Sequence, residues 1–329
     1  RQRQMCIRDR YYLPNLDLTD AELSQLNYAS NSIHLIGELT EEEALRKLGG
    51  YTKQRSDHSA SASIGNFATF DRLFQALSEK KKTSLSGIKK LANDLNKKAD
   101  EFNMENILIM IDIGPDLGKR TKKLDQYHVW IDCAREMKCH SVRVNLRGSE
   151  DNLYNWKQNS IENLNKLCEY AKPLYITIIV ENHGDFSSNA DHLIDVIENV
   201  NHQNVGTLPD FGNFCVKQHP EKYGEASRMF TMGAESKSDR PPTIYDSCAE
   251  RFDMYDGIKK LMKYAKGVSA KTHGFDSDGN DVDINYSKML QIVKNSKYEG
   301  FIGVESQDFT MDPIEAIQAS KKLLLNSYS

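Results

Sequence analysis

The sequence lacks long hydrophobic runs, closely spaced cysteines and a glycine-rich phosphate loop. No apolar run approaches the ~18 to 20 residues that a membrane-spanning helix needs, so no membrane segment is predicted. The six cysteines include no C-x-x-C pair, which argues against a zinc knuckle or a redox dithiol, and we interpret them as reduced core or surface thiols. No G-x-G-x-x-G follows a predicted strand, which argues against a dinucleotide-binding fold.

An excess of positive charge is also missing. The 329 residues carry 43 lysines and arginines against 47 aspartates and glutamates, and the formal net charge is -4. Surfaces that bind nucleic acid or anionic membranes are usually basic. We therefore expect no nucleic-acid partner and no membrane partner, and a small molecule is the better expectation.

The first ten residues, RQRQMCIRDR, differ in composition from the rest of the chain. They contain four arginines and one aspartate with no hydrophobic pattern, and they resemble a translated sequencing adapter. We set residues 1–10 aside as a non-native segment. The native N-terminus, with any export signal, would then lie outside this sequence, and a cytoplasmic location is the working expectation.

Six short apolar segments follow one another along the chain, and each ends in polar residues or glycine. They are 107–112, 141–145, 176–182, 205–210, 268–272 and 301–306. Their starts are separated by 34, 35, 29, 63 and 33 residues. A repeat of about this length corresponds to one strand, one helix and two loops. The pattern predicts an α/β fold, a (β/α)₈ TIM barrel, in a single domain over residues 11–329 that is clearest over 104–329.

Two parts of the chain depart from this repeat. The 63-residue interval contains a polar insertion at about 215–250, which we expect over the carboxyl-terminal face of the barrel as a lid, an oligomer contact or a surface excursion. Upstream, 32–39 reads as a strand, 52–66 as a polar loop and 84–102 as a helix. Extending the repeat backwards places strands near residues 40 and 75, but the second location has a helical pattern. The first two strands are therefore expected to be diverged or incomplete.

Three acidic residues fall at the ends of three predicted strands. Alternation along ITIIVEN places Glu181 on a buried face, and Asp210 and Glu305 end their own strands in the same way. Carboxyl ends of barrel strands meet at one mouth, where three carboxylates are costly without a cation between them. A divalent metal satisfies this requirement. Oxygen ligands with at most one imidazole suit Mn²⁺, Mg²⁺ or Co²⁺, with Zn²⁺ as an alternative.

Other polar residues are predicted around the same mouth. Lys271 and His273 share one face of the strand VSAKTHGFD, so they offer a cation and a nitrogen ligand. Asn213 follows Asp210 by three residues and is a predicted substrate-binding residue. His183 is either a ligand or an ordinary hydrogen-bonded residue, and Arg143 either holds an anionic or polyhydroxyl substrate or forms a structural ion pair.

Taken in order, the segments NILIMID, CHSVRVN, ITIIVENHGDFSSN, NVGTLPDFGNF, YAKGVSAKTHGFD and YEGFIGVES resemble the xylose isomerase-like TIM-barrel superfamily, the sugar phosphate isomerase/epimerase group. The resemblance covers about residues 104–329. It implies that a glutamate, an aspartate, a histidine and a second glutamate bind one divalent metal, and that the two glutamates act as acid and base. Glu181, Asp210 and Glu305 match this pattern.

Two positions depart from the family pattern. Where the family has its histidine ligand this chain has Ser269, and His273 lies four residues later, roughly 13 Å along an extended strand. Either the strand ends early and bends His273 back, or the metal is coordinated differently. Asn213 stands where the epimerases often have a histidine.

The resemblance implies metal-dependent isomerisation or epimerisation of a sugar or sugar derivative through an enediolate. Glu181 or Glu305 would remove a carbon-bound proton, the other would return one, and Lys271 or His183 would stabilise the enediolate charge. One alternative is a non-catalytic carbohydrate-binding barrel. Another is an endonuclease-like phosphodiesterase, but such enzymes hold several zinc ions with several histidines, and only His183 and His273 lie at strand ends here.

Overall fold

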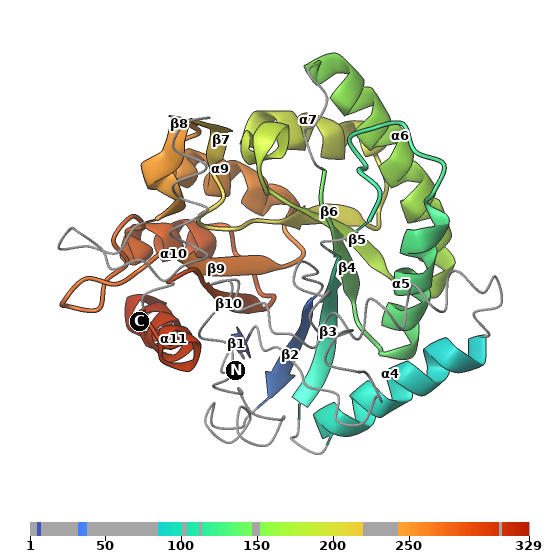
Figure 1. Cartoon of the computed structure of the whole chain (residues 1–329), viewed down its shortest axis with the longest axis horizontal. Coiled ribbons are helices and arrows are strands. Elements are labelled where there is room, and N and C mark those ends of the chain that lie inside the picture. The colour runs from blue at the N-terminus through green and yellow to red at the C-terminus, as the bar shows by residue number, and fades with distance from the viewer. Residues whose placement is uncertain are drawn as a thin grey trace, which may run out of the picture.

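A computed structural model describes most of the chain, and eight of its described strands form one sheet (Figure 1). The described residues are 5–7, 32–37, 85–100, 104–111, 114–146, 152–219, 243–308 and 311–328. The sheet has the order β6-β5-β4-β3-β2-β1-β10-β9. Its strands are β1 (Met5–Ile7), β2 (Ser32–Gly37), β3 (Met104–Met110), β4 (Ser141–Val144), β5 (Thr177–Glu181), β6 (Val205–Leu208), β9 (Val268–Thr272) and β10 (Ile302–Ser306).

The two ends of this sheet meet, so the strands form a barrel. Parallel bridges pair Thr207 with Ala265 and Asp210 with Ser269, which links the end of β6 to β9. Backbone hydrogen bonds support both bridges, including one of 2.9 Å from Ser269 N to the Pro209 carbonyl oxygen. The predicted α/β TIM barrel is confirmed, and the six strands predicted over 107–306 correspond to β3, β4, β5, β6, β9 and β10.

Helices surround the strands (Figure 1), and polar caps define several of their starts. Asn189 caps the predicted helix α7, and its side chain accepts a hydrogen bond from Asp191 N; Asn152, Asp253 and Asn285 cap α6, α9 and α10 in the same way. The helices are α4 (Leu85–Asp100), α5 (Asp125–Glu136), α6 (Leu153–Ala171), α7 (Ala190–Val200), α9 (Met254–Leu261), α10 (Tyr286–Asn295) and α11 (Pro313–Tyr328), with short 3₁₀ turns η2 (Lys172–Leu174), η3 (Asp185–Ser188), η4 (Ile244–Ser247) and η5 (Met262–Tyr264).

Strand β5 shows how alternation divides the core. Ile178 and Val180 belong to the large cluster between the sheet and the helices. Ile179 instead packs inside the barrel with Leu108 and Leu208. Because neighbouring residues of a strand point to opposite faces, Glu181 continues the inner face of Ile179. The row of apolar side chains inside the barrel therefore ends at the acidic side chain of Glu181.

The amino-terminal part departs from a regular barrel. The predicted strand at 32–39 is confirmed as β2, but it runs antiparallel to both β1 and β3, with a register irregularity between His34 and Leu35. The predicted helix at 84–102 is confirmed as α4. Strand β1 comes from the segment 1–10 and pairs in parallel with β10. The loop expected at 52–66 and the strand expected near residue 75 lie outside the described residues.

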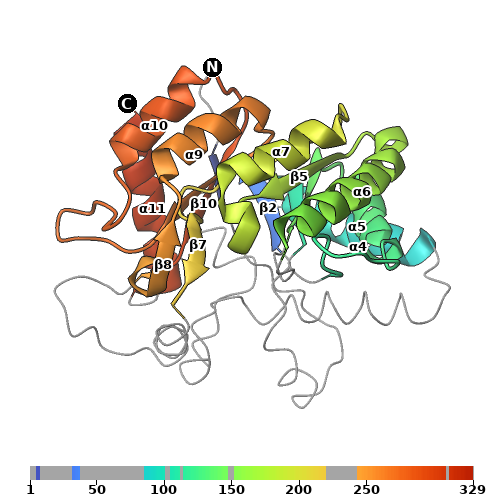
Figure 2. The same ribbon diagram turned by 90° about the horizontal axis from the view of Figure 1, so that it is seen from above.

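The insertion begins and ends in a two-stranded ribbon. Strands β7 (Cys215–Gln218) and β8 (Cys248–Arg251) pair antiparallel, on the α9 side of the barrel and away from α4 and α5 (Figures 1 and 2). A disulfide joins Cys215 to Cys248, whose Cα atoms are 5.7 Å apart. The prediction of reduced thiols is wrong for this pair, because the insertion brings together residues that are 33 positions apart. The remaining described cysteines are free and buried: Cys133, Cys139 and Cys168.

None of the helices within the described ranges combines the length and the apolar composition that crossing a membrane requires.

Candidate functional site

Three carboxylates from three strands converge at the carboxyl-terminal mouth of the barrel. Glu181 ends β5, Asp210 follows β6 by two residues and Glu305 lies in β10. One oxygen of each lies within 4.8 Å of the others, and among the described acidic, histidine and cysteine side chains these three form the group able to share an ion. Glu181 and Asp210 are 1% and 0% exposed, and the Glu305 side chain is 13% exposed. The predicted convergence is therefore present.

Arg143 reaches Glu181 from the neighbouring strand β4. Its Nε lies 2.9 Å from Glu181 Oε2, both side chains are 1% exposed, and its Nη1 donates to the Ile111 carbonyl oxygen at 3.2 Å. Of the two roles predicted for Arg143, the structure shows the ion pair. A buried carboxylate at this position is thus matched by a buried guanidinium.

Lys271 from β9 provides the second cation of the site. Its Nζ lies 3.5 Å from Asp210 Oδ2 and 3.4 Å from Glu305 Oε1. It also donates to Asn213 Oδ1 at 2.9 Å, and Asn213 Nδ2 in turn donates to Glu181 Oε1 at 2.9 Å. Lys271 and Asn213 therefore connect the three carboxylates in one buried network.

Asn182 fixes the turn that carries Asp210. Its Nδ2 donates to the carbonyl oxygens of Asp210 and Asn213 at 3.0 and 3.2 Å, and its Oδ1 accepts from Asp210 N at 2.8 Å. Gly212 N donates to Asp210 Oδ1 at 2.9 Å. Asn182 was not among the site residues predicted from the sequence, because alternation places it on the face away from Glu181. An uncharged amide directly after a strand-end acid was the signal that could have identified it.

The electrostatics of the site are dominated by burial. Burial raises the pKa of Asp210 to about 7, although the Lys271 ammonium acts in the opposite direction. Glu305 and Glu181 raise it further by repulsion. A cation placed among these oxygens would relieve this cost.

His273 lies outside the carboxylate group. Its backbone N–H donates to Asp281 Oδ2 at 2.7 Å, and its Nδ1 lies 3.1 Å from Asp283 Oδ2. The ring meets Tyr245 of η4 edge-on, with centroids 4.8 Å apart. Strand β9 ends at Thr272, and the turn after it directs His273 towards Gly212, where a Cβ atom would lie 2.3 Å from Nε2.

Ser269 stands where the resemblance implies a histidine ligand. Its Oγ donates to Glu305 Oε2 at 3.2 Å. His183, also predicted at the site, lies two residues after β5 and is exposed, and its backbone N–H donates to Ser187 Oγ at 3.1 Å.

The donor set fits a hard divalent cation. Carboxylate oxygens are the ligands that Mg²⁺ and Mn²⁺ prefer, and Zn²⁺ accepts them as well. Asp210 Oδ2 is buried and faces the Lys271 ammonium group, at 3.5 Å. A metal ion bound to this oxygen would take the place of that cation.

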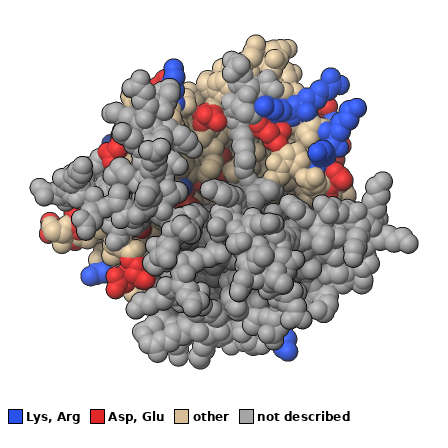
Figure 3. Space-filling model, viewed as in Figure 1, with Lys and Arg blue, Asp and Glu red and all other residues tan. Residues whose placement is uncertain are grey.

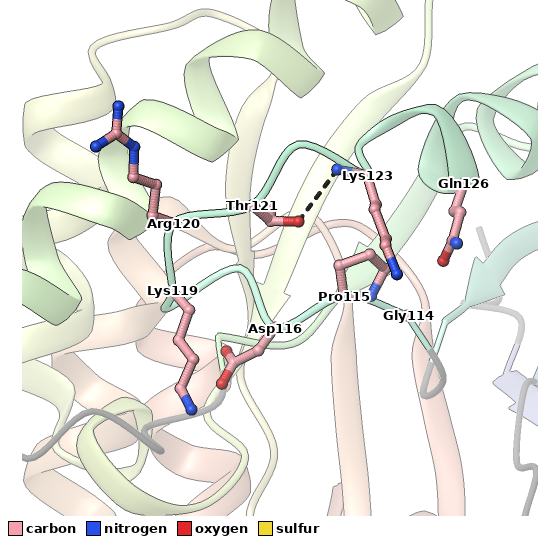
Figure 4. A pocket seen from close by; sticks show the side chains of 8 residues that line it. All are labelled: Gly114, Pro115, Asp116, Lys119, Arg120, Thr121, Lys123 and Gln126. Carbon is pink, nitrogen blue, oxygen red and sulfur yellow. Dashed lines mark hydrogen bonds between the residues drawn. The ribbon is translucent and has the colours of Figure 1, made fainter.

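A second feature of this face is the loop between β3 and α5. It lines a cavity of about 500 Å³ with Gly114, Pro115, Asp116, Lys119, Arg120, Thr121, Lys123 and Gln126 (Figure 4). Asn163 of α6 holds this loop by donating to the carbonyl oxygens of Leu117 and Lys119. In the described part of this face, basic side chains gather on the α6 side, where they are drawn in blue (Figure 3).

Comparison with solved structures gives distant relatives with the same fold. A D-tagatose 3-epimerase-like protein is 16% identical, with a TM-score of 0.52, over 72% of this chain and 82% of that chain. The 3-keto-D-glucoside 4-epimerase YcjR from E. coli is 10% identical, with a TM-score of 0.52, over 77% and 94%. The IOLI protein with a bound zinc atom is 15% identical, with a TM-score of 0.50, over 72% and 81%. At these identities the likeness shows the fold alone.

No curated protein sequence matches the chain. The family described as xylose isomerase-like TIM barrel matches residues 60–327, which is most of the chain and includes all three carboxylates. The chain belongs to the xylose isomerase-like TIM barrel family.

Proposed function

We propose that the protein is a divalent-metal-dependent isomerase or epimerase that acts on a sugar or a sugar derivative. The observation that carries the proposal is the convergence of Glu181, Asp210 and Glu305 within 4.8 Å at the mouth of the barrel. Family membership adds support, as do the two solved relatives of the same fold that are named as sugar epimerases.

The three carboxylates would hold the metal ion, which we expect to be Mn²⁺, Mg²⁺ or Co²⁺, with Zn²⁺ as an alternative. When bound, such an ion polarises a carbonyl and a neighbouring hydroxyl and so acidifies the carbon-bound proton between them. This role requires oxygen atoms from more than one strand facing one point, and Glu181, Asp210 and Glu305 supply them.

The two glutamates are the proposed proton carriers. Glu181 and Glu305 come from β5 and β10, which are separated by β6 and β9 around the barrel, so they approach a substrate from different sides. Arg143 and Asn213 fix both oxygens of Glu181, while Glu305 is the more accessible carboxylate. One glutamate removes the proton and the other returns one to the opposite face or to the adjacent carbon.

The Lys271 ammonium would stabilise the negative charge that develops on substrate oxygens during this transfer. It is buried, held by Asn213 and placed between two of the carboxylates. His183 lies exposed beside the same mouth and is a proposed substrate contact. The Asn213 side chain is hydrogen-bonded to both Glu181 and Lys271, so its proposed role is to orient these two residues.

The test is incorporation of solvent deuterium at carbon. The protein is incubated in D₂O with D-tagatose and with a 3-keto-D-glucoside, with added Mn²⁺, and the products are read by NMR. We expect deuterium at the epimerised or isomerised carbon, and a loss of roughly 10²- to 10⁴-fold in Glu181→Gln and Glu305→Gln. Glu162→Gln is the control, because Glu162 is an exposed residue paired with Lys166 on α6. Turnover without deuterium, undiminished in both glutamine variants, would refute the assignment.

Elemental analysis separates the enzyme from a carbohydrate-binding barrel. One metal ion per chain, lost in Asp210→Asn, supports the enzyme. Absence of metal, together with sugar affinity that is unchanged in Glu305→Ala, favours a binding module instead. Three zinc ions per chain with salt-sensitive DNA binding would favour the endonuclease-like alternative, although the carboxylate group contains no histidine among the residues described.

A further inference from the structure

We propose that Lys271 is a built-in cation of the carboxylate site, that a divalent metal must displace its ammonium group, and that this competition sets the metal affinity. The inference rests on the proposed function because it concerns the same site. It assigns to Lys271 a control over metal binding that is separate from any contact with substrate.

The position of Lys271 is fixed by the sheet. In the parallel pair of β9 and β10, Lys271 lies beside Glu305 in register, and Ser269 lies beside Gly303. Lys271 is 1% exposed, and its stem passes so close to Gly212 that a Cβ atom there would lie 3.0 Å from Lys271 Cδ. The ammonium is therefore held at the mouth by the backbone register and by packing, as well as by its ionic contacts.

The ammonium contacts the oxygens that a metal would use. Lys271 Nζ lies 3.5 Å from Asp210 Oδ2 and 3.4 Å from Glu305 Oε1. A divalent ion bound to the same two carboxylates has its oxygens at about 2.0–2.2 Å. Two cations would then be only a few ångströms apart, and a divalent ion and an ammonium group repel each other strongly at that separation. The metal and the ammonium cannot both occupy the space between these oxygens.

The charges of the site divide into two parts. Glu181 has its own cation in Arg143, at 2.9 Å. Asp210 and Glu305 share Lys271. Without metal, Lys271 therefore compensates Asp210 and Glu305, and the site can exist in the folded chain before any ion arrives.

Strand β9 thus brings the positive charge of Lys271 to the carboxylates, and its inward-facing residues supply no neutral nitrogen ligand. Ser269, the other inward residue of β9 beside this group, donates a hydrogen bond to Glu305, and His273 lies outside the group against Asp281 and Asp283. A serine hydroxyl that already donates to a carboxylate is a poor substitute for an imidazole ligand. Strand β9 therefore opposes metal binding through the Lys271 charge, and loss of this charge should strengthen the binding.

The experiment compares Mn²⁺ binding and thermal stability in five forms of the full chain: wild type, Lys271→Met, Lys271→Gln, Lys271→Arg and the control Lys166→Met. Lys166 is a half-exposed residue of α6 paired with Glu162. Binding is measured by titration calorimetry and by the electron paramagnetic resonance of free Mn²⁺, after removal of metal with EDTA. Thermal unfolding is followed with and without Mn²⁺.

We expect Lys271→Met to bind Mn²⁺ roughly 10- to 1,000-fold more tightly than wild type, since the competing charge is gone. Its melting temperature should fall without metal and recover with Mn²⁺. Lys271→Arg and Lys166→Met should not bind Mn²⁺ more tightly than wild type. A Lys271→Met chain that folds only when Mn²⁺ is supplied supports the same conclusion.

Three results would overturn the proposal, and they distinguish its failure from failure of the proposed function. If wild type binds one Mn²⁺ and Lys271→Met binds it equally or more weakly, the competition is wrong while the metal-dependent function stands. If neither form binds Mn²⁺, Mg²⁺, Co²⁺ or Zn²⁺, the metal-dependent function fails, and the competition fails with it. If Lys271→Met and Lys271→Gln fold in neither condition, a metal does not replace the lysine and the proposal is wrong.

Discussion

Arg143 and Glu181 form a buried ion pair between neighbouring barrel strands, with Arg143 Nε 2.9 Å from Glu181 Oε2 and both side chains 1% exposed. The pair places a charged group of β4 against the strand-end acid of β5. It holds Glu181 in one orientation, and Asn213 holds the other carboxylate oxygen. The side chain proposed to carry protons is thus among the most constrained in the site.

Replacing Arg143 with methionine should destabilise the protein by about 3–5 kcal/mol, because it leaves the Glu181 charge buried without its partner. Equilibrium unfolding in urea measures the change. The double variant Arg143→Met/Glu181→Gln removes both charges and should recover a large part of the loss. If the double variant is as unstable as the sum of the single variants, the ion pair is not coupled in the way the geometry indicates.

Replacing Asn182 with alanine should reduce both stability and metal binding. Asn182 joins β5 to the turn of Asp210 through three hydrogen bonds, and losing such buried bonds costs about 1–3 kcal/mol for each group left unpaired. Asn204 provides a matched control, since its amide donates to the carbonyl oxygens of Cys168 and Ile176 near the other end of the same strand pair. Asn204→Ala should lose stability but keep Mn²⁺ affinity. Equal losses of affinity in both variants would contradict a specific role for Asn182.

The sequence was sufficient to predict the barrel and the convergence of its acids because both follow from short-range periodicity. Alternation along β5 places Glu181 on the face of Ile179, and the same rule applies to Glu305 in β10 and to Asp210, whose backbone stays paired with Ser269 beyond the end of β6. The rule does not apply where the backbone turns. His273 shares the face of Lys271 only while the backbone stays extended, and β9 ends at Thr272. The turn that follows places His273 in contact with Asp281 and Asp283 instead.

Other features depend on contacts between distant segments, which periodicity does not contain. The role of Asn182 exists only because the β6 turn returns beside β5. The disulfide forms because β7 and β8 pair across the insertion, and no local spacing of Cys215 and Cys248 indicates this. The antiparallel direction of β2 likewise depends on where the preceding chain places it, since a single apolar strand reads the same in either direction.

The Cys215–Cys248 disulfide should make the insertion sensitive to reducing agents. A non-reducing peptide map should contain the linked pair. Cys133 and Cys139 should resist alkylation in the native protein, because burial raises the pKa of both thiols. Dithiothreitol should lower the stability of the wild type, and removal of the crosslink in Cys215→Ser/Cys248→Ser should cost about 2–4 kcal/mol. If dithiothreitol lowers the stability of the double serine variant equally, the effect does not come from this disulfide.

The raised pKa of Asp210 predicts a pH dependence in EDTA, with no metal bound. Burial raises the folded-state pKa to about 7, above its ordinary value of 3.8, so the folded protein binds the proton more tightly than the unfolded chain does. The contribution of Asp210 to stability is therefore complete below pH 3.8 and is lost as the pH rises towards 7. Asp210→Asn removes it. The unfolding free energy of Asp210→Asn, measured relative to wild type, should rise over this range, and a constant difference would contradict the pKa shift.

The last prediction concerns Gly212, which lies against the ring of His273. A Cβ atom at this position would be 2.3 Å from His273 Nε2 and 3.0 Å from Lys271 Cδ, so Gly212→Ala should displace both side chains and destabilise the protein by about 1–3 kcal/mol. Urea unfolding measures this loss. His273→Ala removes the closer atom, so the double variant Gly212→Ala/His273→Ala should be more stable than the sum of the single losses predicts. Strict additivity would instead show that the backbone at Gly212, and not contact with His273, accounts for the effect.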